Sequence, residues 1–178
     1  MGLRQIIRDA GRGAVAGVIG TVLMDGLWYW RYRRRGGEQD VLSWEFGSHP
    51  ATWREAPAPA RMGRVLVKAL LSRDVPVARA GLVGTVMHWG YGPGWGAQFG
   101  VLAAHSAVRP GVVSGAGFGA LVWTSDYVTL PLLGVYEPIW RYKPGILRDD
   151  LTAHLVYGIG TGVALRVLRW SRGSAAEP

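Results

Sequence analysis

Cysteine is missing from this chain of 178 residues. Without a thiol, the chain has no disulfide scaffold, no thiolate metal site and no cysteine nucleophile. The catalytic motifs G-x-S-x-G and H-E-x-x-H and the phosphate-binding P-loop are also missing. The sequence therefore favours a protein that is not an enzyme, and it leaves open only lipid-modifying catalysis at a membrane edge.

Charge is missing from long stretches of the chain. No Asp, Glu, Lys or Arg occurs in residues 80–108 or 151–165, and only one occurs in each of 13–30 and 110–136. A membrane-spanning helix needs about 20 mostly apolar residues. A soluble bundle of long buried helices is the alternative. We predict four transmembrane helices, over residues 13–31, 82–105, 111–135 and 151–169.

The charges that are present are mostly positive, with a net charge of +8 and a pI near 10.4. They flank the apolar segments, as in membrane proteins. The sequence has no motif that combines base-stacking aromatic residues with basic residues, as nucleic-acid-binding modules do. We therefore expect no nucleic-acid partner. The first span is not followed by a small-residue cleavage site, and we expect it to stay attached. The location predicted from these features is a membrane, crossed several times.

The region between the first two spans, residues 36–80, holds a proline- and glycine-rich loop and an amphipathic segment. Residues 61–73 place apolar side chains at helical spacing, with Arg61, Arg64 and Lys68 on the opposite face. A basic amphipathic helix of this size can lie in the membrane interface and bind anionic lipid head groups. The alternative is an ordinary helix packed on the bundle ends.

The tail from Ser171 is expected to be disordered. Residues 1–12 are expected to form a short interfacial lead-in. Asp9, Asp149 and Asp150 are expected to be interfacial caps, with Asp149 or Asp150 as the N-cap of the fourth helix.

One motif occurs twice. The pattern H-x-x-Y-G-x-G-x-G begins at His88 and again at His154, and it includes Tyr91 in the first copy and Tyr157 in the second. We infer two related halves, residues 13–105 and 110–170, each a pair of helices. Because each half has an even number of spans, both run the same way through the bilayer, and their pseudo-twofold axis parallels the membrane normal.

Glycines recur four residues apart in the apolar segments. Residues four apart lie on one helix face, and small residues there let helix backbones approach closely in lipid. The fold predicted is therefore all-α, a single four-helix integral membrane bundle built from two tandem helix pairs with the glycine ridges facing inward. The ridge residues are Gly84, Gly92, Gly96, Gly100, Gly111, Gly115, Gly119, Gly158 and Gly162.

The candidate functional residues are ionisable side chains inside the apolar segments. His88 and His154 belong to the glycine ridges and should face the bundle interior, while Asp25 and Asp126 lie in the other two spans. Ionisable groups within membrane spans are functional candidates by default. With Tyr91 and Tyr157, they form a predicted proton relay or ion site.

Two other interpretations of the histidines stay open. In the first, they only fix helix register through hydrogen bonds, in a structural or interaction protein. In the second, they are axial ligands of a haem, with the neighbouring glycines giving room for a flat macrocycle. The sequence does not determine the transported species or any metal. It also leaves the oligomeric state open, and a homo-oligomer is one of the states it allows.

The stretch from Asp126 to Arg169 resembles the C-terminal part of the YagU-like small inner-membrane proteins of bacteria. The residues that carry this resemblance are Pro131-Leu132-Leu133-Gly134, Pro138, Asp150 and His154-Leu155-Val156. It covers about a quarter of the chain in detail. It implies an inner-membrane protein associated with acid tolerance, and it implies no catalytic or binding residues.

Overall fold

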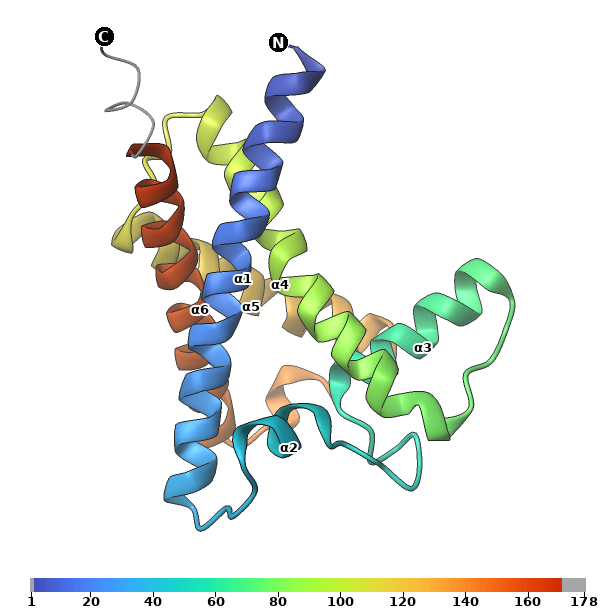
Figure 1. Ribbon diagram of the computed structural model, residues 1–178. Coiled ribbons are helices and arrows are strands. Elements are labelled where there is room, and N and C mark those ends of the chain that lie inside the picture. The colour runs from blue at the N-terminus through green and yellow to red at the C-terminus, as the bar shows by residue number, and fades with distance from the viewer. Residues whose placement is uncertain (1, 171–178) are drawn as a thin grey trace, which may run out of the picture. The chain divides into compact units, whose positions relative to one another are not determined.

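Every regular element in residues 2–170, the part that the computed structural model describes, is a helix (Figure 1). The all-α prediction is therefore confirmed, and the tail predicted from Ser171 lies outside the described residues. The α-helices are α1 (Leu3–Arg34), α2 (Val41–Phe46), α3 (Ala58–Leu71), α4 (Ala80–His105), α5 (Val112–Leu132) and α6 (Pro144–Trp170), and the short 3₁₀ helices are η1 (Val77–Arg79) and η2 (Ile139–Arg141).

The chain forms two compact units, and each draws on both of the sequential halves 13–105 and 110–170. Unit 1 contains the chain up to Trp28, Tyr91–Thr124 and the chain from Pro144 onward. Unit 2 contains Tyr29–Gly90 and Ser125–Lys143.

Three helix boundaries differ from the sequence-based expectation. The lead-in expected over residues 1–12 is part of α1, which begins at Leu3. The N-cap expected at Asp149 or Asp150 is wrong, because α6 already begins at Pro144, and proline is favoured at the first helical position. The short helix α2 lies in the expected loop, where the Asp40 carboxylate accepts hydrogen bonds from the backbone N–H groups of residues 42 and 43.

Unit 1 has two seams in which glycines let helix backbones meet. In the first, a Cβ added to Gly96 of α4 would lie 2.6 Å from the Cα of Gly17 in α1. In the second, a Cβ added to Gly158 of α6 would lie 2.7 Å from the Cα of Gly119 in α5. Figure 1 shows these four helices side by side. Only glycine fits at either position without moving a backbone.

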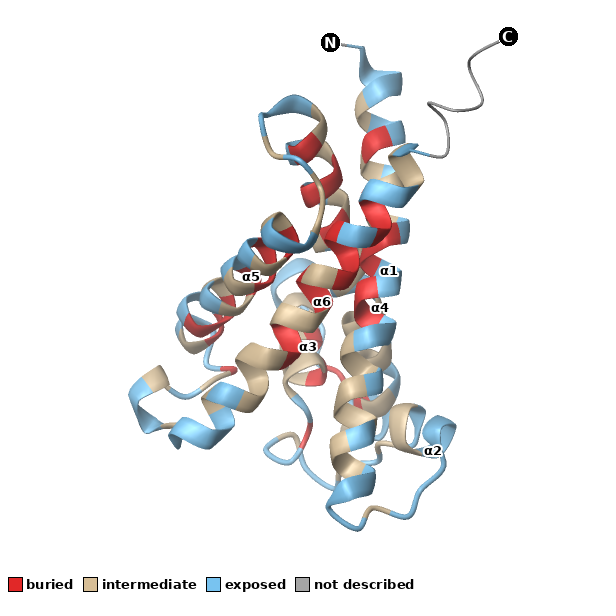
Figure 2. Ribbon diagram, turned by 90° about the vertical axis from the view of Figure 1, so that its left-hand side faces the viewer, coloured by how far each residue is buried: buried red, intermediate tan, exposed pale blue. Residues whose placement is uncertain are grey.

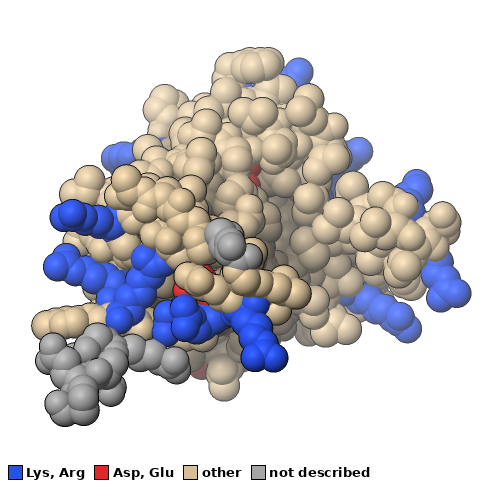
Figure 3. Space-filling model, turned by 90° about the horizontal axis from the view of Figure 1, so that it is seen from above, with Lys and Arg blue, Asp and Glu red and all other residues tan. Residues whose placement is uncertain are grey.

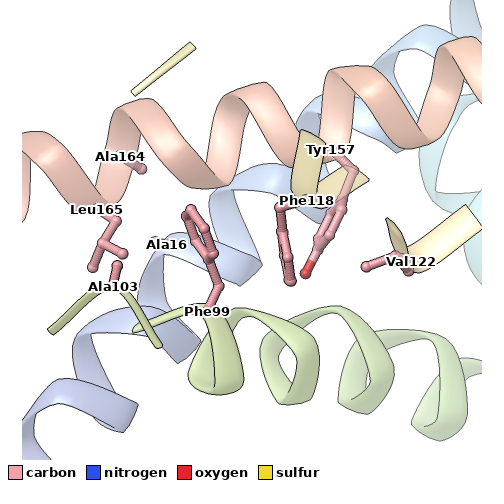
Figure 4. Close-up of a cluster of buried hydrophobic side chains, with 8 residues drawn as sticks. All are labelled: Ala16, Phe99, Ala103, Phe118, Val122, Tyr157, Ala164 and Leu165. Atoms are coloured by element: carbon pink, nitrogen blue, oxygen red, sulfur yellow. The ribbon is translucent and has the colours of Figure 1, made fainter. Parts of the chain in front are cut away.

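The side chains between the seams form the core of unit 1. The rings of Phe99 and Phe118 stack with their centroids 4.5 Å apart, and Tyr157 lies beside them (Figure 4). Leu165 is completely buried next to this aromatic group. Buried residues line the inner sides of α1, α4 and α6 (Figure 2). Aromatic rings therefore fill the space that the closely packed backbones leave.

Unit 2 is organised around the crossing of α3 and the first turns of α4. A Cβ on Gly84 would lie 3.3 Å from the Cβ of Ala60 in α3. Gly84 therefore packs on α3 in unit 2, whereas Gly92, Gly96 and Gly100 pack on α1 in unit 1. One run of regularly spaced glycines thus serves two different contacts.

One of the described helices, α6, is long and apolar enough by length and composition to cross a membrane. Helices α4 and α5 are nearly free of charge, but Gly, Trp and Tyr dilute their aliphatic residues. Residues 2–170 thus form a helical protein with one helix of that kind, and the four-span bundle stays a prediction.

Candidate functional site

The structure divides the predicted relay residues between the two units. Unit 1 contains Asp25, Tyr91, His154 and Tyr157, and unit 2 contains His88 and Asp126. The side chains of His154, Tyr157 and Asp126 are buried, those of Asp25 and His88 are half-buried, and that of Tyr91 is exposed. Within unit 1, the best-defined site is centred on His154.

His154 forms a pair with a carboxylate one helical turn before it. Its Nδ1 lies 3.5 Å from Oδ1 of Asp150 and 2.9 Å from the backbone carbonyl oxygen of the same residue. The imidazole is 10% exposed and the carboxylate 17%. The two side chains lie on the same face because α6 begins at Pro144, before Asp150. Asp150 and His154 are therefore both inside the helix, four residues apart. A largely buried imidazole–carboxylate pair can exchange a proton between its members.

A stripe of polar side chains continues from this pair along one face of α6. Tyr157 donates a hydrogen bond of 2.6 Å from its hydroxyl to the carbonyl oxygen of Gly92. Thr161, which is completely buried, donates to the carbonyl oxygen of Tyr157 at 2.8 Å. From Asp150 to Thr161 the stripe rises roughly 16 Å along the helix axis, at 1.5 Å per residue. Beyond it on the same helix, Leu165 is completely buried.

Sequence reasoning missed a second buried carboxylate in unit 1. Asp9 was expected to be an interfacial cap, but it lies inside α1 and its side chain is 5% exposed. Its Oδ1 is 3.7 Å from Arg12, and its Oδ2 is 3.7 Å from Nε2 of His105 at the end of α4. The signal was present in the sequence, since Asp9 precedes Gly13 by four residues and so lies on the buried glycine face.

The predicted site residues of unit 2 have different surroundings. The ring of His88 meets that of Trp89 edge-on, with centroids 6.1 Å apart. The indole N–H of Trp89 donates to Oε1 of Glu45 at 2.9 Å. Asp126 is 5% exposed. His88 thus lies next to a carboxylate-bound indole, a pairing that its place in the repeat did not predict.

Neighbouring helices occupy the space beside two of the glycines invoked for the haem interpretation. That interpretation relied on empty space beside the histidines, at the glycines that follow them. At Gly158 that space is taken by the backbone of α5, and at Gly92 by the side chain of Thr21 in α1. Gly92 and Gly158 therefore do not provide the space that this interpretation assigned to the macrocycle.

The basic face expected on α3 is partly neutralised. Arg64 forms a two-pronged ion pair with Asp74, with both nitrogen–oxygen distances 2.8 Å, and its guanidinium lies 4.9 Å above the ring centre of Trp53. The hydrogen bonds from Arg64 lower the pKa of the Asp74 carboxyl to about 2. Arg61 is half-buried and Lys68 is exposed. Of the three expected lipid ligands, only Lys68 is exposed, and its charge also helps to lower the pKa of the Asp74 carboxyl.

Comparison with known protein families, with curated proteins and with solved structures found no match to this chain.

Proposed function

We propose that this chain is a multi-pass protein of a bacterial inner membrane that handles protons at the largely buried Asp150–His154 pair. The location is supported by the apolar surface of unit 1. Large aliphatic side chains are exposed on all four of its helices, for example Val15, Leu102, Leu121 and Val167, while glycines and polar groups lie inside. Water disfavours this distribution, whereas lipid favours it.

The proposed bundle contains two related helix pairs. In the first pair, Gly96 of α4 packs on Gly13 and Gly17 of α1, and in the second, Gly162 of α6 packs on Gly111 and Gly115 of α5. Within each pair, the contacted glycines are four residues apart. The same glycine contact built twice supports a duplicated unit.

The observation that carries the proposed activity is the largely buried imidazole–carboxylate pair. In lipid, a polar group of this kind is costly and is usually retained for a role in transport or proton transfer. The hydroxyls of Tyr157 and Thr161 extend the polar stripe inward from it. The resemblance to YagU-like proteins, with their association with acid tolerance, points the same way. The roles proposed for His88, Asp126 and Asp25 stay predictions.

The test is proton flux across a reconstituted bilayer. The purified protein is placed in liposomes that contain a pH-sensitive dye, and the decay of an imposed pH gradient is measured. Substituting His154→Ala or Asp150→Asn should slow the protein-dependent decay by about 100-fold or more, as expected when a proton-transfer group is lost.

The matched control is His49→Ala, which removes an exposed histidine from the loop between α2 and α3. This variant should retain the wild-type rate. A wild-type protein that leaves the gradient as stable as empty liposomes do would contradict the proposal. A folded His154→Ala variant with unchanged flux would show instead that the pair only fixes helix packing.

A further inference from the structure

One end of unit 1 gathers arginines from α1, from α6 and from the loop between α4 and α5. Three observations place these helix ends together. A Cβ on Gly100 of α4 would lie 2.7 Å from the Cα of Gly13 in α1, and Arg169 of α6 donates to the carbonyl oxygens of Gly100 and Ala103 at 3.3 and 3.1 Å. The start of α5 joins them through Gly162, whose added Cβ would lie 2.9 Å from the Cα of Gly115. The arginines near this end, called here the arginine end, are Arg4, Arg8, Arg12, Arg109, Arg166 and Arg169.

Almost nothing neutralises this positive charge. In residues 2–24, 91–124 and 151–170, Asp9 is the single acidic residue. Its carboxylate is buried and already engaged by Arg12 at 3.7 Å and Arg8 at 4.0 Å. Among the described residues, no ion pair neutralises Arg4, Arg109 or Arg166. Figure 3, which views the molecule from this side, shows Lys and Arg side chains grouped there.

Large apolar side chains are exposed at the same end. Leu3 is 71% exposed, Val113 is 87% exposed and Trp170 is 76% exposed. An anion such as free phosphate would use the arginines and leave these side chains in water. A phospholipid satisfies both groups at once, because its phosphate pairs with guanidinium and its acyl chains cover the apolar side chains.

We infer that the arginine end binds the head group of an anionic phospholipid, with Arg4, Arg109 and Arg166 as the cations that the phosphate meets. Asp9 limits the repulsion between Arg8 and Arg12, so that these two guanidinium groups can be held close together. Arg169 is tied to α4 carbonyl oxygens and positions the end of α6. The inference rests on the proposed membrane location and is independent of the proposed proton activity.

The experiment measures lipid binding to the purified full-length protein in a neutral detergent. Phosphatidylglycerol is titrated into the micelles, with phosphatidylcholine as the uncharged reference, and bound lipid is counted by native mass spectrometry. The wild type should prefer phosphatidylglycerol. Substituting Arg4→Gln, Arg109→Gln and Arg166→Gln together should weaken that binding on the order of a hundredfold, since each basic residue near a membrane surface contributes about fivefold.

The matched control removes three exposed cations from unit 2, through Arg54→Gln, Arg73→Gln and Lys143→Gln. It loses the same total charge and should retain the wild-type affinity. An equal loss in this control would overturn the inference, because net charge alone would then explain the binding. Circular dichroism checks that both triple variants remain helical.

Three other results would overturn the inference. They are equal affinity for the two lipids, displacement of phosphatidylglycerol by inorganic phosphate at the same concentration, and equally tight binding of a short single-stranded DNA. The membrane location is tested separately. Recovery of the protein in the soluble fraction of lysed cells would contradict the location, whereas membrane-embedded protein without lipid preference would contradict only the lipid inference.

Discussion

Two glycines of α4, two residues apart, should respond in opposite ways to substitution by alanine. A Cβ on Gly96 would lie 2.6 Å from the Cα of Gly17, whereas a Cβ on Gly94 would meet nothing within 4 Å. Carbon atoms in contact prefer about 3.5–4.0 Å. The Gly96→Ala variant must therefore push α1 and α4 apart locally by about 1 Å.

The expected energies follow from this difference. Alanine is favoured over glycine inside a helix by roughly 0.5–1 kcal/mol, and both variants gain this. Forcing an extra carbon into a packed contact costs about 1–3 kcal/mol, and only Gly96→Ala incurs that cost. Gly94→Ala should thus be slightly more stable than the wild type, and Gly96→Ala should be about 1–3 kcal/mol less stable than Gly94→Ala.

The assay is equilibrium unfolding followed by far-UV circular dichroism and tryptophan fluorescence, in detergent if extraction requires it. For a chain of this size, the two midpoint temperatures should differ by roughly 3–10 °C. The second seam offers an independent pair, with Gly158→Ala as the crowded variant and Gly117→Ala as the open one. Equal stability of Gly96→Ala and Gly94→Ala would refute the account of the seam.

Two further predictions concern single polar contacts. Tyr157→Phe should lower the free energy of unfolding by about 1 kcal/mol, because it removes the 2.6 Å hydrogen bond to Gly92 and keeps the ring; the same unfolding assay checks it, and an unchanged midpoint would contradict it. The pKa of Asp74 is lowered by Arg64 to about 2, so its ion pair stabilises the fold above the ordinary carboxyl value near 4 and is lost as the pH falls towards 2. In Asp74→Asn the melting temperature should therefore fall less between pH 4 and pH 2 than in the wild type, and parallel curves would show that the pair contributes nothing.

The sequence predicted only part of the candidate site. The repeat identified His154 and Tyr157, and both are buried in unit 1. Asp150 was assigned to a cap, because the sequence did not reveal that α6 begins six residues earlier. Its carboxylate and the imidazole of His154 are paired because both lie inside one helix, four residues apart. The burial of Asp9 also depended on a tertiary contact, the approach of α4 to α1 at Gly13.

The sequence by itself determined where the long helices lie and which faces they bury. Long stretches without charge and glycines at a spacing of four are local properties of the chain, and helical geometry converts them directly into positions on a face. Only the tertiary structure decided which face packs on which. Gly84 and Gly92 belong to one run of glycines but contact α3 and α1 respectively. Glycine faces are alike in shape and carry no side chain to specify a partner, so the choice between them depends on the sum of all other contacts in each unit.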